Sequence, residues 1–301
     1  MAPTTTTIWT GPVLCFGELV WDLRPRSKRF LGGAPINVAV HLQRLGCAAV
    51  PVTAVGRDDL GREALMLLET WGLDTRAVAQ VAELSTGTVK VAFRSGAPSF
   101  SYATEVAWEA IPVSSALQAV ARRAIAVVHG SLALNSRANA GAIAQILDAN
   151  PGLHVFDANL RGPDADPRDL LRAAHSADLV KVNRDELGAL LGGEVAEDAL
   201  EPAAAALGDR CNAARVCVTD GAAGAGLLDL GRWFWEPARP VEVRDTVGAG
   251  DAFLAGLLSG LLADEAPAAA LARACRLAEF VAGQEGPTPD VREADLPDTT
   301  G

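Results

Sequence analysis

Short apolar runs rich in β-branched residues alternate with longer segments of helical spacing along most of the chain. The runs that predict buried strands are residues 13–16, 50–55, 126–129, 154–157, 179–183 and 216–219. The segments with apolar residues at helical spacing are 35–45, 61–71, 138–149, 168–176, 184–191, 197–207, 249–262 and 267–283. Parallel strands need long crossover connections, which helices supply. The alternation therefore predicts an α/β fold with a mostly parallel sheet covered by helices on both faces.

Residues 87–102 interrupt this alternation. They read GTVKVAFRSGAPSFSY, two strand-like runs on either side of a Ser-Gly-Ala-Pro turn. In the first run Val89, Val91 and Phe93 alternate with polar residues, which gives one apolar and one polar face. The pattern fits either an antiparallel edge of the main sheet or a separate flap, and we favour a small flap outside the main sheet.

The 301 residues contain no internal repeat and no low-complexity linker that would divide them. We therefore expect a single domain over residues 12–286. The terminal segments 1–11 and 287–301 are rich in Thr, Pro and Asp, and we expect them to be frayed.

The acidic composition excludes several classes of partner. A formal net charge of −11 argues against a nucleic-acid backbone and against an anionic membrane surface. No stretch is long and apolar enough to span a bilayer, and the first ten residues lack the basic residues of a secretion signal. The five cysteines are scattered and never form a C-x-x-C pair, so they predict free thiols in a reducing cytoplasm.

The segment 242–256, EVRDTVGAGDAFLAG, carries the most informative chemical pattern. Gly248 and Gly250 let the backbone turn tightly and approach a ligand, and an apolar helix follows at once. The start of a helix offers unpaired N–H groups and the positive end of the helix dipole. The segment therefore predicts an anion site built without Lys or Arg. Asp251, in the first helical turn, fits either a helix cap or a general base beside that site.

Other nucleotide motifs are missing. The chain has no G-x-x-x-x-G-K-[ST] loop and none of the His-Arg-Asp or Asp-Phe-Gly triplets of protein kinases. The run GAAGAG at 221–226 is not G-x-G-x-x-G, and we interpret it as a turn. A nicotinamide oxidoreductase is excluded because it would need that fingerprint.

A second polar constellation follows the predicted strand at 13–16. Asp22 lies shortly after this strand, and the segment LGGAPIN at 31–37 opens the next helix with paired glycines, a proline and Asn37. Asp22 and Asn37 offer the acceptors and the donor that a polyhydroxylated ligand needs. Taken alone, each also fits a turn Asp or a first-turn Asn.

Two longer segments resemble a known family. LGGAPINVAVHLQRLG (31–46) and DTVGAGDAFLAG (245–256) are similar to the two signature regions of the PfkB, or ribokinase-like, carbohydrate kinases. VGRDDLG (55–61), VKVNRDEL (180–187) and VTDGAAG (218–224) lie between them in the order of that family, so the resemblance covers nearly the whole chain. It implies a three-layer α/β/α fold with a mostly parallel central sheet and a small β-sheet lid, with lid strands at about 17–30 and 87–104.

The resemblance also implies an ATP-dependent phosphotransferase that uses Mg²⁺. The residues that match the catalytic base and the anion hole are Asp251, Gly248, Ala249 and Gly250. The residues that match sugar-binding positions are Asp22, Gly32, Gly33 and Asn37. The residues that match the nucleotide side are Asn183, Thr219, Gly221 and again Gly250. Glu186 completes an N-x-x-E element with Asn183 and is expected to hold Mg²⁺ through water.

The sugar itself is less firmly indicated. FDANLR (156–161) resembles the D-x-N-x-R of fructokinases and 2-keto-3-deoxygluconate kinases, which gives Asn159 a substrate-binding role. Arg161 then reaches the transferring phosphate or the substrate, although it also fits a surface arginine. Arg94 and Tyr102 are the substrate-binding candidates of the lid, and the residues after Tyr102 include no further arginine for a carboxylate substrate.

A neutral sugar is therefore favoured, and fructokinase is the first choice, although an aromatic-Arg step usual in fructokinases is missing. The alternatives are a 2-keto-3-deoxygluconate kinase, a nucleoside kinase of the same family, and a non-catalytic sugar sensor on the same fold. A sensor would be expected to lose the base or an anion-hole glycine, and this chain keeps both.

Two further properties are common among the relatives. Activation by K⁺ would use backbone oxygens near Asp245 and Val247, although GQEGP stands at 283–287, where relatives often show a Gly-Ala step near the adenine and a monovalent-cation loop. Pairing of two copies through the lid is permitted by the apolar face of residues 88–93.

Overall fold

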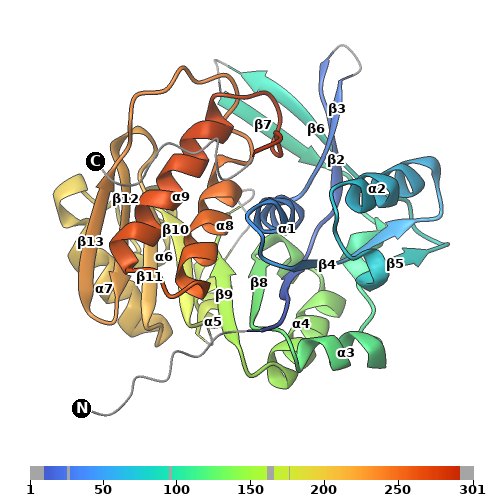
Figure 1. Ribbon diagram of the computed structural model, residues 1–301, viewed down its shortest axis with the longest axis horizontal. Coiled ribbons are helices and arrows are strands. Elements are labelled where there is room, and N and C mark those ends of the chain that lie inside the picture. The colour runs from blue at the N-terminus through green and yellow to red at the C-terminus, as the bar shows by residue number, and fades with distance from the viewer. Residues whose placement is uncertain (1–9, 26–27, 95–96, 161–165, 176, 292–301) are drawn as a thin grey trace.

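The computed structural model describes residues 10–25, 28–94, 97–160, 166–175 and 177–291, and within 91–100 the backbone alone. The largest unit is a nine-stranded sheet in the order β13-β12-β11-β10-β9-β8-β1-β4-β5 (Figure 1). Its strands are β1 (Val13–Phe16), β4 (Ala49–Gly56), β5 (Val78–Val81), β8 (Ala126–Gly130), β9 (Leu153–Asp157), β10 (Leu179–Asn183), β11 (Arg215–Thr219), β12 (Gly224–Asp229) and β13 (Arg232–Pro237). Every pair from β5 to β11 is parallel, whereas β12 and β13 join antiparallel at one edge.

Helices cover both faces of this sheet. One layer holds α1 (Ala34–Arg44), α2 (Asp59–Thr70), α8 (Ala249–Leu262) and α9 (Pro267–Ala282). The other holds α3 (Ser115–Ala121), α4 (Arg137–Ala149), α5 (Pro167–Ala174), α6 (Arg184–Leu191) and α7 (Leu200–Cys211). In Figure 1 helices α1, α8 and α9 of the first layer lie in front of the strands, and α3 and α4 of the second layer lie below them. This is the three-layer α/β/α arrangement that the sequence predicts.

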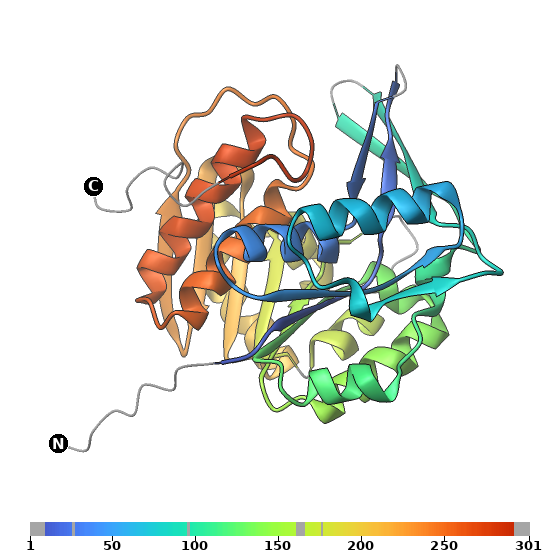
Figure 2. The ribbon, with the colours of Figure 1, turned by 45° about the vertical axis from the view of Figure 1, so that its right-hand side comes forward.

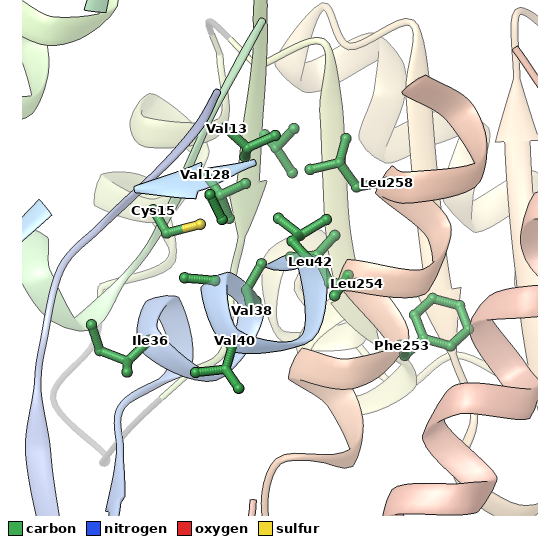
Figure 3. Packing of buried hydrophobic residues seen from close by; sticks show 14 of the residues in the cluster. Val13, Cys15, Ile36, Val38, Val40, Leu42, Val128, Phe253, Leu254 and Leu258 are labelled. Carbon is green, nitrogen blue, oxygen red and sulfur yellow. The ribbon is translucent and has the colours of Figure 1, made fainter. Parts of the chain in front are cut away.

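The two core layers follow from the alternation of side chains along each strand. In β1, Val13 and Cys15 point into the cluster that α1 and α8 complete, which Figure 3 shows around Leu42 and Leu258. Leu14 and Phe16 point to the opposite face, where the cluster includes residues of α3 and α4. Because both faces are buried, the central strands are apolar throughout, without the alternation of a half-exposed strand.

A second, four-stranded sheet forms the lid. Its order is β3-β2-β6-β7, with β2 (Val20–Leu23), β3 (Arg29–Gly32), β6 (Gly87–Arg94) and β7 (Ala97–Tyr102). The hairpin β6–β7 is antiparallel, and β6 pairs in parallel with β2. Figure 2 shows these strands standing away from the main sheet. The hairpin at 87–102 is thus a flap and not an edge of the main sheet.

The C-terminal segment differs from the expected frayed end at 287–301. Residues 287–291 pack on α1: His41 Nε2 lies 3.0 Å from the oxygen of Pro287, and Arg44 donates to the oxygens of Thr288 and Pro289. Val291 is only 1% exposed. The polar composition of this segment does not indicate that Val291 is buried or that His41 and Arg44 contact its backbone oxygens.

The structure also bears on the expectations about membrane spans and free cysteines. In the described part of the chain, none of the helices is long and apolar enough to cross a membrane. All five cysteines are free thiols, and all but the half-buried Cys47 lie in the interior. Burial raises the pKa of the Cys275 thiol to about 12, so this side chain behaves as a small apolar residue.

Candidate active site

A polar cavity of about 270 Å³ lies where the carboxyl ends of the parallel strands meet the lid and the start of α8. The lining residues that the sequence singles out are Asp22, Gly33, Asn37, Tyr102, Asn159, Asn183, Glu186, Thr219, Val247, Gly248, Gly250 and Asp251. The carboxyl ends of strands are the usual ligand-binding edge of an open α/β sheet. The topology therefore gathers at one place residues that are spread over more than two hundred positions of the chain.

Asp251 and Asn37 meet across this cavity. Nδ2 of Asn37 donates a hydrogen bond of 2.7 Å to Oδ2 of Asp251, although the two residues are 214 positions apart. Only 4% of Asn37 and 7% of Asp251 are exposed. The contact exists because α1 and α8 pack side by side with their first turns at the same level. It joins the two signature segments into one site.

Both helices are preceded by glycines at which a Cβ atom would collide with neighbouring backbone. Gly33 precedes α1 with φ of 110°, and a Cβ there would lie 2.2 Å from the backbone oxygen of Glu18. Gly248 precedes α8 in the left-handed region with φ of 84°. A Cβ on Gly248 would lie 2.6 Å from Cα of Pro287. The close packing of these turns brings the N-terminal N–H groups of α8 to the cavity, where they favour an anion.

Lys181 is a site residue that the sequence analysis missed. Its ammonium group lies 2.9 and 3.0 Å from the two carboxylate oxygens of Asp157, and 8% of its side chain is exposed. A methyl group on Gly250 would lie 3.4 Å from Nζ, so the ammonium faces the glycine turn. Burial alone would lower the pKa of Lys181, but the charges of Asp157, Glu186 and Asp251 outweigh it and raise this pKa above its ordinary value. The site thus holds a permanent positive charge beside the anion hole.

Glu186 is fixed by three backbone and side-chain contacts. Asn183 caps α6 by accepting from the N–H of Glu186, and the Glu186 carboxylate accepts from the N–H of Asn183, each at 2.8 Å. The other carboxylate oxygen accepts from the N–H of Leu160 at 2.8 Å, which ties α6 to the loop after β9. Each oxygen keeps a lone pair for a further partner, so Glu186 suits a contact to a hydrated cation.

Within the described ranges, no three His, Cys, Asp or Glu side chains are placed to hold a metal directly. A Mg²⁺ ion that is held mostly by phosphate oxygens and water fits this site, because Mg²⁺ keeps several waters and needs few protein carboxylates.

The end of the cavity beside the lid combines acidic groups with an open hydrogen-bond acceptor. Asp22 comes from β2 of the lid, and Glu18 lies just before it, with Oε1 accepting from the N–H of Ala34. Oδ1 of Asn37 is buried and has no hydrogen-bond partner among the described residues, so it can accept from a ligand hydroxyl. Glu18 was missed by the sequence analysis, although it stands directly after the glycine that follows β1.

Comparison with known proteins assigns the family. The family model for pfkB family carbohydrate kinases matches residues 13–294, nearly the whole chain. The chain belongs to the pfkB family of carbohydrate kinases. It is 34% identical to a fructokinase of Klebsiella pneumoniae, in a match that covers 88% of this chain and 92% of that one.

Solved structures agree with this assignment. A fructokinase double mutant of Vibrio cholerae, in a form with bound fructose, ADP and potassium ion, has a TM-score of 0.76 and 27% identity, covering 92% of this kinase and 94% of that chain. An aminoimidazole riboside kinase of Salmonella enterica, complexed with aminoimidazole riboside and an ATP analogue, has a TM-score of 0.76 and 26% identity, covering 95% and 96%. This kinase is therefore a sugar phosphotransferase by family and by fold.

Some expected site residues of this kinase lie beside the cavity and not on its wall. These are Gly32 at the end of β3, Ala249 in the first turn of α8, Gly221 in the turn after β11, and Asp245. Asp245 is buried below the glycine turn, where its Oδ1 accepts from the N–H of Val247 at 3.1 Å. Arg161 and the side chain of Arg94 lie outside the described residues, so their assigned roles remain predictions.

Proposed function

We propose that this kinase transfers the γ-phosphoryl group of ATP to a hydroxyl of a neutral sugar, with fructose as the first candidate. The observation that carries the proposal is the Asn37–Asp251 hydrogen bond, because it places a carboxylate between the polyol-binding end of the cavity and the glycine turn. A base that takes the proton of the acceptor hydroxyl must lie between the acceptor and the phosphoryl group that is transferred to it.

In the proposed reaction Asp251 accepts the proton of the attacking sugar hydroxyl. The sugar oxygen forms a bond to the γ-phosphorus, the bond between that phosphorus and the bridging oxygen breaks, and ADP leaves with the electron pair. The Asn37 amide keeps the Asp251 carboxylate aimed into the cavity. An ionised base is required, and the ammonium of Lys181 nearby favours the ionised form of Asp251.

Charge on the travelling phosphoryl group is stabilised from two sides. The N-terminal N–H groups of α8 present donors at the glycine turn, and Lys181 presents its ammonium beside Gly250. Mg²⁺ bound to the nucleotide supplies neutralisation of the phosphate oxygens, and Glu186 with Asn183 is the pair that we propose holds its water shell. The protein contributes position and charge rather than covalent chemistry.

The charges of the cavity favour a neutral acceptor. Four acidic residues line it, namely Glu18, Asp22, Glu186 and Asp251. Among the described lining residues Lys181 is the one cation, and Asp157 already pairs with it. A substrate carboxylate at the end formed by Glu18 and Asp22 would meet like charges, which disfavours 2-keto-3-deoxygluconate. The fructokinases among the relatives support fructose.

A riboside is the second candidate, because the chain is also 32% identical to an aminoimidazole riboside kinase of Salmonella typhimurium. Such an acceptor would use the same base and glycine turn and differ only in the sugar end of the cavity. Cytoplasmic location and pairing of two copies through the lid remain predictions from the sequence.

The test is ATP-dependent phosphorylation of a panel of acceptors: fructose, ribose, adenosine and 2-keto-3-deoxygluconate, with each product identified by mass spectrometry. We expect the highest kcat/KM for fructose. A preference for 2-keto-3-deoxygluconate would overturn the charge argument, and a preference for a riboside would favour the second candidate. A chain that binds sugars but forms no phosphorylated product with any acceptor would be a sensor, and the proposed function would be wrong.

A further inference from the structure

A buried arginine stands next to the glycine turn without lining the cavity. Arg24 follows β2 in the turn that leads to β3, and 8% of its side chain is exposed. Its Nη1 donates a 2.6 Å hydrogen bond to Oδ2 of Asp245, which is 221 positions away. The guanidinium also lies over the ring of Phe30, 4.6 Å from its centroid. An arginine held between an aromatic ring and a buried carboxylate has a fixed position and a fixed charge.

Asp245 connects three separate segments of the chain. Oδ1 accepts from the N–H of Val247 in the glycine turn, and Oδ2 accepts both from Arg24 and from the N–H of Gly286 at 3.0 Å. The carboxylate thereby holds the anion-hole turn, the C-terminal segment and the turn between β2 and β3 together. Its side chain is 5% exposed, so its charge needs a cation within the protein.

Arg24 carries a charge that Asp245 alone neutralises. Its Nε and Nη2 atoms are buried and have no hydrogen-bond partner among the described residues. No second acidic side chain forms a salt bridge with Arg24 in the described part of the chain. One buried positive charge and one buried negative charge are therefore matched beside the turn.

A monovalent cation does not fit this arrangement. The Vibrio cholerae fructokinase is described with a bound potassium ion, and the family resemblance placed such an ion on backbone oxygens near Asp245 and Val247. In this kinase both carboxylate oxygens of Asp245 already accept hydrogen bonds, one of them from a cation. A second positive charge beside the guanidinium would be repelled in a buried site, where charges are weakly screened.

We propose that the Arg24 guanidinium takes the place of a monovalent cation behind the anion hole, so that this kinase turns over without K⁺. Arg24 acts as a positioning residue, since it holds Asp245, and Asp245 holds the N–H of Val247 in the turn that leads to Gly248. This inference rests on the proposed sugar-kinase function, because its main readout is turnover.

The first experiment compares the wild-type kinase in 100 mM KCl, NaCl and tetramethylammonium chloride, at equal ionic strength and with Mg²⁺ present. Sugar phosphate is measured directly by mass spectrometry, so that no coupling enzyme responds to K⁺. We expect turnover to agree within twofold among the three salts. A larger activation that KCl alone produces would overturn the proposal.

The second experiment removes the guanidinium and leaves its space open to a cation. Arg24→Ala leaves Asp245 without its cation, and we expect turnover in tetramethylammonium chloride to fall at least tenfold and to recover at least fivefold in KCl. We also expect KCl, without any substrate, to raise the Tm of Arg24→Ala by several degrees and to leave the wild-type Tm unchanged. Because the Tm is measured without substrate, it detects K⁺ binding at the vacated position independently of any effect on catalysis.

The matched control is Arg29→Ala in the neighbouring lid strand. Arg29 pairs with Glu63 at the surface and makes no contact with Asp245 in the described structure. It should respond to salt as the wild type does. A loss in Arg24→Ala that KCl does not repair would overturn the replacement of a cation by Arg24. If Arg24→Ala fails to fold, the wild-type salt series decides alone, and absence of product in every salt would count against the proposed function instead.

Discussion

Replacement of Asp251 by Asn tests the base directly, because the change removes a charge and keeps the shape. The amide of an asparagine at 251 has an oxygen that can still accept from Nδ2 of Asn37, which now bonds to Oδ2 of Asp251 at 2.7 Å. The residue is buried at the first turn of α8, so the packing around it is unchanged. What is lost is the ability to take the proton of the sugar hydroxyl.

The magnitude follows from this role. A positioned general base contributes about 10²–10⁴-fold to a rate, which corresponds to about 3–5 kcal/mol of activation free energy. Binding of ATP should stay near normal or tighten slightly. Asp251 is one of the carboxylates that attract the Lys181 ammonium, so neutralising it leaves more of that positive charge for phosphate.

The assay measures kcat from ADP release and the Kd of ATP with Mg²⁺ by calorimetry. The control is Asp264→Asn at the far end of the same helix, where the residue is exposed and has φ of 60°, a conformation that Asn tolerates well. This control should keep full turnover. If Asp251→Asn retained more than a tenth of the wild-type kcat, Asp251 would not be the base.

Three further changes address charge, backbone and pH. Lys181→Met leaves the buried Asp157 unpaired, so we expect urea unfolding to show a loss of about 3–5 kcal/mol in stability together with a lower kcat; unchanged stability would contradict the buried pair. Gly248→Ala should lower the free energy of unfolding both because φ is positive there and because the new Cβ would clash with Pro287. Gly192→Ala, with φ of 87° and open space around its Cβ, should cost only about 1–2 kcal/mol of stability. Equal losses in the two variants would contradict the steric argument. Burial lowers the pKa of His129 from 6.5 to about 4, so the unfolded chain takes up its proton first as the pH falls. The free energy of unfolding should therefore decline between about pH 6.5 and pH 4, by up to about 3 kcal/mol for this group, and His129→Gln should flatten that decline; an identical slope in the variant would refute the assignment.

Local patterns predicted most of the regular elements. β1, β10, α6 and α8 begin and end at the residues that the apolar periodicity indicates, because each is buried on its core side and flanked by Gly, Asn or a polar turn. The glycine turn before α8 was also visible, since its φ is a property of the backbone alone.

Short or partly exposed elements were missed. α3 has seven residues, too few to show a helical period, and β5 has one buried residue, Val78, among its four. The edge strand β13, in which Arg232 and Trp235 are exposed, has little of the apolar signal of the central strands. Their structure depends on pairing with elements that lie elsewhere in the chain, so the local sequence is not enough to predict them.

The amino-acid order by itself determined the α/β layering, the hairpin at 87–102 and the two glycine-rich helix starts, because these depend on residue spacing and on backbone freedom within a few positions. Tertiary structure alone decided which polar and charged groups meet: Asn37 with Asp251, Lys181 with Asp157, and Arg24 with Asp245. The physical reason is that a charge acquires its strength from burial and from the distance to its partner, and both are set by how the parallel sheet brings remote strand ends together.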